Sequence, residues 1–121
     1  MEIIDANIIL RYLLNDHEDF SKRSISILER KNIRFLFEVC AEVVYVLEKV
    51  YNVPRKDITN SLTILLDYQN VSTSDTDILK KALKIYSDKN IDFVDSILIA
   101  YNHVSGGVIH SFDKKVNNLC K

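Results

Sequence analysis

The chain has 121 residues, of which 47% are hydrophobic and 27% are charged. This composition predicts a single folded domain with a packed core and excludes wholesale disorder. Sixteen basic and 17 acidic residues leave a formal net charge of -1. The balanced charge excludes a globally basic nucleic-acid binder, so any contact with nucleic acid must depend on a local patch or on metal ions.

Targeting and cysteine features favour a cytoplasmic protein. Residues 1–5 contain no basic run followed by a long apolar stretch, so they do not look like a secretory signal. No segment reaches the ~20 uninterrupted apolar residues of a membrane helix, and we expect no membrane partner. Cys40 and Cys120 lack metal-site spacing and are too few for a disulfide framework, which favours a reduced setting.

The first half of the chain is predicted to alternate short apolar strands with helices. Strands are expected at residues 3–4 and 34–37, and helices at 8–14, 21–30 and 38–51. The last of these has the clearest pattern, because five apolar residues fall on one stripe of the helix: Val39, Val43, Val46, Leu47 and Val50.

The second half continues the alternation. Helices are expected from Pro54 to about Tyr68, from Asp75 to Asp88 with Ser74 as N-cap, and from Asp92 to Val104. Gly106 and Gly107 should end the last of these helices. Strands are expected at 71–73 and 108–112, and Asp113 should open a final short helix.

This alternation predicts an α/β fold with a central parallel β-sheet flanked by α-helices. In such folds, ligands bind beyond the carboxyl ends of the strands. Asp5 follows the first strand, Glu42 lies early in the helix after the second, and Asp113 follows the last. Asp92 and Asp95 open a helix that can begin near the same rim. We therefore expect these carboxylates to converge.

Each acid also has a purely structural interpretation. Asp5 and Asp113 can be helix N-caps, which is the commoner role of Asp at a strand-to-helix junction. Glu42 falls at the edge of an apolar stripe, where a salt bridge would also explain it. Asp95 lies in a helix that is apolar nearly all round and is expected to be central, so its carboxylate needs a partner or a metal ion; the alternative is a capping pair with Asp92.

Converging carboxylates repel one another and raise their own pKa values, and a divalent cation relieves this repulsion. Oxygen ligands without nearby His or Cys favour Mg²⁺ or Mn²⁺ over Zn²⁺. Such ions activate water and stabilise charge on a phosphodiester. The pattern thus indicates metal-dependent hydrolysis of a phosphodiester.

Four segments, in this order, resemble PIN-domain proteins, especially VapC-type toxins. They are IDANIILRYLLND at 4–16, AEVVYVL at 41–47, DFVDSILIA at 92–100 and SFDKK at 111–115. The resemblance implies a PIN-like fold over residues 1–121 as a single nuclease domain, with Mg²⁺- or Mn²⁺-dependent endoribonuclease activity. It also implies a homodimer and a cognate antitoxin that blocks the site.

Carried over residue by residue, the resemblance assigns the catalytic and metal-binding acids and their supports. The acids are Asp5, Glu42, Asp95 and Asp113, with Asp92 as a further acid of less certain role, and the supporting residues are Asn7 and Ser111. Ala6 stands where the family usually has Thr, which removes a hydroxyl but no ligand.

Two other functions stay open at this point. One is a PIN-like nuclease that acts in RNA processing outside a toxin–antitoxin pair. The other is a catalytically silent α/β interaction module whose acids are caps and salt bridges. Basic residues near the expected rim are candidates for contacts with RNA phosphates, although a solvated surface also explains them: Arg11, Lys114 and Lys115.

Overall fold

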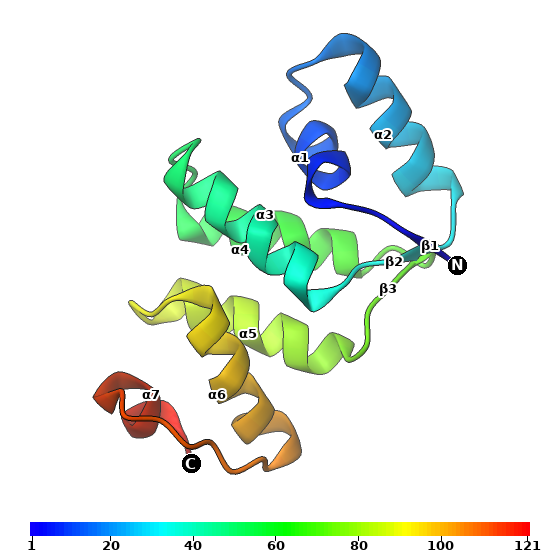
Figure 1. Ribbon diagram of the computed structural model, residues 1–121. Coiled ribbons are helices and arrows are strands. Elements are labelled where there is room, and N and C mark those ends of the chain that lie inside the picture. The colour runs from blue at the N-terminus through cyan, green and yellow to red at the C-terminus, as the bar shows by residue number, and fades with distance from the viewer. The chain divides into compact units, whose positions relative to one another are not determined.

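The computed structural model describes residues 1–121 and contains seven helices and three short strands (Figure 1). The chain divides into two compact units, residues 1–74 (the N-terminal unit) and residues 75–121 (the C-terminal unit). None of the helices is both long enough and apolar enough to cross a membrane.

The N-terminal unit contains the whole sheet. Its strands are β1 (Glu2–Ile3), β2 (Ile33–Arg34) and β3 (Val71–Ser72), which pair in parallel in the order β1-β2-β3. The predicted parallel α/β sheet with flanking helices is therefore confirmed. The second strand ends earlier than predicted, because Phe37 already begins the next helix.

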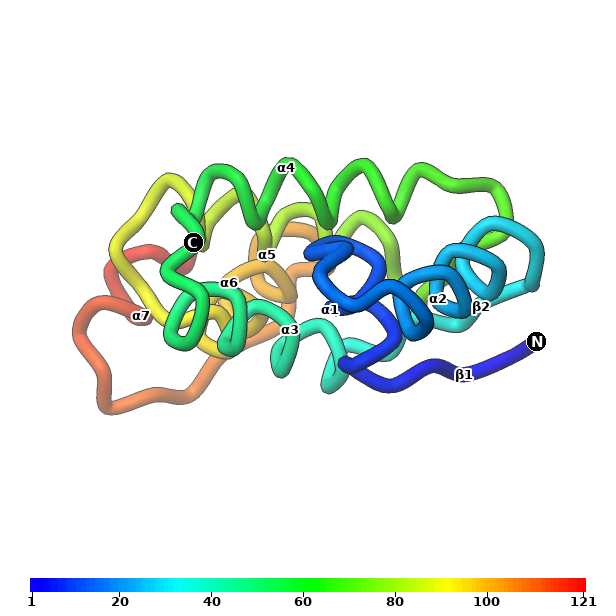
Figure 2. The backbone as a smooth tube through the Cα atoms, turned by 90° about the horizontal axis from the view of Figure 1, so that it is seen from above, coloured from blue at the N-terminus to red at the C-terminus, as the bar shows by residue number.

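Four helices complete this unit: α1 (Ala6–Leu14), α2 (Glu18–Arg30), α3 (Phe37–Lys49) and α4 (Arg55–Leu66). Two helices follow β1 and two follow β2, and α1 lies against both α2 and α3 (Figure 2). Apolar side chains from the strands and helices form the core, among them Ile9, Leu28, Ile33, Phe35, Val43, Leu47, Ile58 and Leu62. Burial of these side chains supplies the main force that folds the unit.

The C-terminal unit consists of α5 (Thr76–Asp88), α6 (Phe93–Ser105) and α7 (Lys114–Leu119). The rings of Tyr86 on α5 and Phe93 on α6 meet edge to face with centroids 5.6 Å apart. The N-cap of α5 is Asp75 rather than the predicted Ser74, because the Asp75 carboxylate accepts a hydrogen bond from the backbone N–H of Ile78 at 3.0 Å. Gly106, with φ of 73°, ends α6 as predicted.

The predicted strand at 108–112 is wrong, because this segment pairs with no strand. The apolar residues that suggested it are on the surface: Val108 is 80% exposed and Phe112 is fully exposed. The backbone carbonyl of Ser111 accepts a hydrogen bond from the side-chain amide of Asn117 at 2.9 Å rather than from a neighbouring strand.

The prediction that α6 is a central helix is also wrong. One side of α6 is buried through Phe93, Ser96, Ile99 and Ala100. The other side carries apolar residues that are 37–59% exposed, namely Val94, Leu98, Tyr101 and Val104. When a helix is apolar nearly all round, its sequence does not reveal which side packs against other elements.

Candidate active site

In the N-terminal unit, Asp5 and Glu42 line one cavity of about 260 Å³, together with Asn7 and Arg11. Asp5 stands between β1 and α1, and Glu42 projects from α3. The packing of α1 against α3 brings these residues together although 37 positions separate the two acids in the sequence.

Asp5 is the N-cap of α1, as its structural interpretation predicted. Its Oδ1 accepts a hydrogen bond from the backbone N–H of Ile8 at 3.2 Å. The carboxylate is exposed, and this bond occupies only one of its two oxygens. Capping and binding a ligand are therefore compatible at this residue.

Glu42 is exposed, so the edge of the apolar stripe does not bury it as the sequence pattern suggested. The alternative explanation by a salt bridge is not realised, because Glu42 belongs to none of the ion pairs of the chain. It stands at the cavity as an unpaired carboxylate, and capping cannot explain it, since it lies in the second turn of α3.

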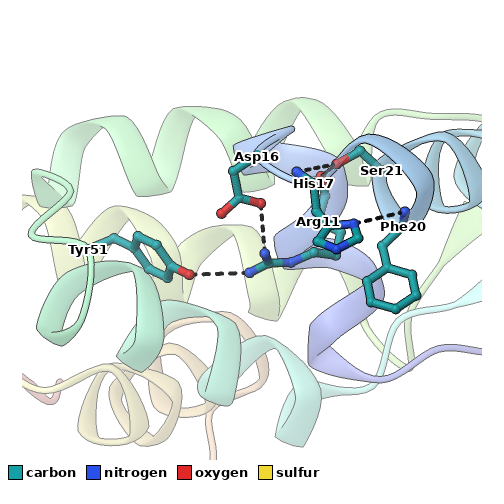
Figure 3. Close-up of polar contacts among 6 residues, drawn as sticks. All are labelled: Arg11, Asp16, His17, Phe20, Ser21 and Tyr51. Carbon is teal, nitrogen blue, oxygen red and sulfur yellow. Dashed lines mark hydrogen bonds and ion pairs between the residues drawn. The ribbon is translucent and has the colours of Figure 1, made fainter.

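A fixed cation borders the same cavity. The guanidinium of Arg11 forms an ion pair with Asp16 at 2.7 Å and donates to the hydroxyl of Tyr51 at 3.2 Å (Figure 3). The hydrogen bond to Tyr51 and the charge of Asp16 raise the pKa of Arg11. Arg11 was a candidate from the sequence, but its partners Asp16 and Tyr51 were not predicted. The contact with Tyr51 spans 40 positions and has no local signal.

The C-terminal unit contains the other predicted acids. Asp92 is the N-cap residue of α6 by its backbone, but its side chain makes no capping hydrogen bond and is exposed. Asp95 lies in the first turn of α6 and is half-buried. Asp113 caps α7, accepting from the backbone N–H of Lys115 at 2.8 Å, and α7 packs against α6.

Two of the predicted acids of this unit, Asp92 and Asp113, act electrostatically on the third, Asp95. Burial raises the pKa of Asp95 above its ordinary value of 3.8, and the negative charges of Asp113 and Asp92 raise it further. Asp95 therefore lies in the field of two other carboxylates of its unit, and a bound cation would relieve this repulsion.

The supporting and basic residues have specific contacts in this unit. The Ser111 hydroxyl accepts a hydrogen bond from the backbone N–H of Asp113 at 2.9 Å, so it holds the backbone of that acid rather than its carboxylate. The Lys115 ammonium donates to the carbonyl of Asn90 at 3.3 Å. Lys114 is exposed.

The raised pKa of Asp95 predicts how the stability of the metal-free protein depends on pH. The folded chain holds the Asp95 proton more tightly than the unfolded chain, so this contribution to stability is full below pH 3.8 and is lost as pH rises through the raised pKa. Asp95→Asn should abolish this loss. In urea unfolding with EDTA, the variant should be more stable than the parent at neutral pH, and the difference should shrink toward pH 3. A difference that grows toward acidic pH would contradict the prediction.

The donor set suits a hard divalent cation, since it consists of carboxylates without His or Cys. No group of three or more His, Cys, Asp or Glu side chains is arranged as a complete metal site in this structure. In the N-terminal unit, Asp5 and Glu42 line one cavity. In the C-terminal unit, the negative charges of Asp92 and Asp113 act on Asp95.

Comparison with known proteins assigns a family to the chain. The PIN domain family model matches residues 3–121, which is nearly the whole chain. No curated protein and no solved structure shows significant similarity to the chain.

Proposed function

This chain belongs to the PIN-domain family, whose members are generally nucleases, and on that premise we propose that it is an endoribonuclease that depends on Mg²⁺ or Mn²⁺. The observation that carries the proposal is the unpaired Glu42 beside Asp5 on one cavity, matched by the charge-coupled acids around Asp95. Glu42 neither caps a helix nor belongs to an ion pair, and carboxylate oxygens are the ligands that a hard divalent cation prefers.

In this proposal, Asp5 and Glu42 in the N-terminal unit and Asp95 and Asp113 in the C-terminal unit are the metal-binding acids, and Asp92 assists from the start of α6. A bound divalent ion would supply an activated water and would stabilise charge on the phosphodiester. Asn7 borders the cavity, where its amide would hold a carboxylate or a water in place, while Ser111 fixes the backbone of Asp113. Asp16 and Tyr51 hold the guanidinium of Arg11 in place at the cavity, where it is a candidate contact for an RNA phosphate. Lys114 and Lys115 are further candidates.

The family match over residues 3–121 supports one PIN-like nuclease domain that includes both units. The resemblance of four segments to VapC-type toxins carries the finer proposal: a cytoplasmic toxin of a toxin–antitoxin pair that forms a homodimer and is blocked by a cognate antitoxin. Co-expression with the product of a neighbouring small reading frame would test the antitoxin. The frame's product should bind the chain and suppress its cleavage of RNA.

Cleavage of total RNA with and without metal ions tests the proposed activity. Cleavage should occur with Mg²⁺ or Mn²⁺ and should stop when EDTA is added, because in this proposal the metal ion supplies the activated water and stabilises charge on the phosphodiester. Restoring Mn²⁺ in excess over EDTA should restore cleavage, which controls for damage by the chelator. Full cleavage in metal-free buffer would overturn the mechanism, and no cleavage together with no Mn²⁺ binding would favour the silent module.

A further inference from the structure

A second and larger cavity, of about 530 Å³, lies in the N-terminal unit where α1 faces α2. Asp5 and Arg11 line both this cavity and the smaller one that holds Glu42. The larger cavity therefore adjoins the proposed catalytic acids. The other residues that line it, among them His17, Phe20 and Arg23, have no role in the proposed metal chemistry.

One wall is a pair of stacked rings. The imidazole of His17 and the phenyl ring of Phe20 lie with centroids 4.3 Å apart and planes 17° from parallel. Phe20 is 51% exposed, so the pair presents a flat apolar surface to solvent instead of completing the core. An exposed aromatic face at a cavity is a typical platform for a nucleobase.

Hydrogen bonds hold this ring pair in place (Figure 3). His17 is the N-cap of α2, and its Nδ1 accepts from the backbone N–H of Phe20 at 3.3 Å. The Ser21 hydroxyl accepts from the N–H of His17 at 3.3 Å and donates to the carbonyl of Arg11 at 3.1 Å, so the start of α2 is tied to α1. The platform is thus preorganised, which lowers the entropy lost on binding.

The same cavity contains one guanidinium without a counter-charge, that of Arg23, because the guanidinium of Arg11 is paired with Asp16. Arg11 and Arg23 line it, and Asp5 is the one acid among its lining residues. Arg23 is exposed and belongs to no ion pair. An unpaired guanidinium beside an aromatic platform matches the chemistry of a nucleotide, whose base stacks and whose phosphate binds Arg.

We propose that the cavity formed by His17, Phe20, Arg11 and Arg23 is a nucleobase subsite that binds an unstacked base of single-stranded RNA next to the cleavage site. The base stacks on Phe20, and Arg23 binds a flanking phosphate. This inference rests on the proposed ribonuclease function and adds a binding site for one base of the substrate. Bases in a duplex are stacked on their neighbours, so the subsite selects single strands, loops or ends.

A tryptophan reporter tests the stacking directly, because the chain contains no tryptophan. Phe20→Trp places an indole on the platform, and Tyr45→Trp, at a 63% exposed position on α3 outside both cavities, is the matched control. With EDTA present to prevent cleavage, a short single-stranded RNA should quench the fluorescence of the Phe20→Trp variant. It should leave the Tyr45→Trp variant unchanged, and the same RNA as a duplex should quench neither.

Cleavage kinetics with Mn²⁺ provide a second measurement. Phe20→Ala should raise KM for a single-stranded substrate by roughly tenfold or more with kcat little changed, because stacking contributes to binding rather than to the chemical step. Phe20→Tyr should restore most of the affinity, and Tyr45→Ala should match the parent. An unchanged KM in Phe20→Ala would overturn the subsite.

The outcomes separate this inference from the proposed function. Cleavage without quenching of the Phe20→Trp variant would overturn the subsite and leave the nuclease function intact, and the cavity would then fit a protein partner better. Quenching by single-stranded RNA in a chain that cleaves no RNA would support the subsite and overturn the nuclease function. Equal quenching by the duplex would overturn the selection of an unstacked base.

Discussion

Replacing Asp95 by Asn is expected to lower RNA cleavage by roughly a thousandfold or more, about 4 kcal/mol of transition-state stabilisation. An amide has no negative charge and binds a hard divalent cation poorly. The same substitution at Asp92, three residues earlier, should leave substantial cleavage. The pair is informative because both acids belong to the start of α6 and differ little in sequence context.

The structure separates the two residues by their surroundings. Asp92 precedes the helix and is exposed, so its carboxylate is largely hydrated. Asp95 is inside the helix and half-buried, and the charges of Asp113 and Asp92 act on it. The Asp92 side chain is exposed and makes no capping hydrogen bond, so Asp92→Asn should change the free energy of unfolding by at most about 1 kcal/mol.

Melting curves and initial cleavage rates of the two variants, measured with saturating Mn²⁺, would decide the assignment. Intact folding of Asp95→Asn, shown by a cooperative melt, is needed for its loss of activity to be meaningful. If Asp95→Asn cleaves like the parent while Asp92→Asn is inactive, the roles are exchanged and the metal site centres on Asp92.

The sequence predicted the elements whose signals are local. The apolar stripe from Val39 to Val50 gave α3 to within two residues at its C-terminal end, and Gly106 marked the end of α6. Short apolar strands between helices were sufficient to predict a parallel sheet. These features succeed because periodicity and glycine stereochemistry act within a few residues.

Features that depend on tertiary partners could not be predicted. The apolar pattern of 108–112 suited a strand, but a strand exists only where a neighbour pairs with it. The exposure of Glu42 depends on which side of α3 is covered, and the contact of Arg11 with Tyr51 depends on how α1 packs near the end of α3. The acids could be proposed from the sequence because most of them stand at strand or helix ends and because the four segments that contain them resemble PIN-domain proteins.

Asp5 gives the sharpest test of whether a helix cap also binds the metal ion, because the chain contains a matched cap without a proposed catalytic role. Asp75 caps α5 as Asp5 caps α1: each carboxylate accepts from the backbone N–H three residues on, at 3.0 Å and 3.2 Å respectively. Asp75 belongs to neither the predicted metal site nor the two cavities around Asp5. A residue that only caps should therefore behave like Asp75.

Asn preserves a cap and removes the charge, so Asp5→Asn and Asp75→Asn should each change the free energy of unfolding by less than about 1 kcal/mol. Their activities should differ sharply. Asp5→Asn should lose cleavage by roughly a hundredfold or more, since a ligand of the divalent ion is gone, while Asp75→Asn should cleave like the parent. Ala at either position should cost about 1 kcal/mol of stability through the lost cap. Urea unfolding and cleavage rates of the four variants would measure both effects. Parent-like cleavage by Asp5→Asn would reduce Asp5 to a structural cap and would leave Glu42 as the sole candidate ligand on its cavity.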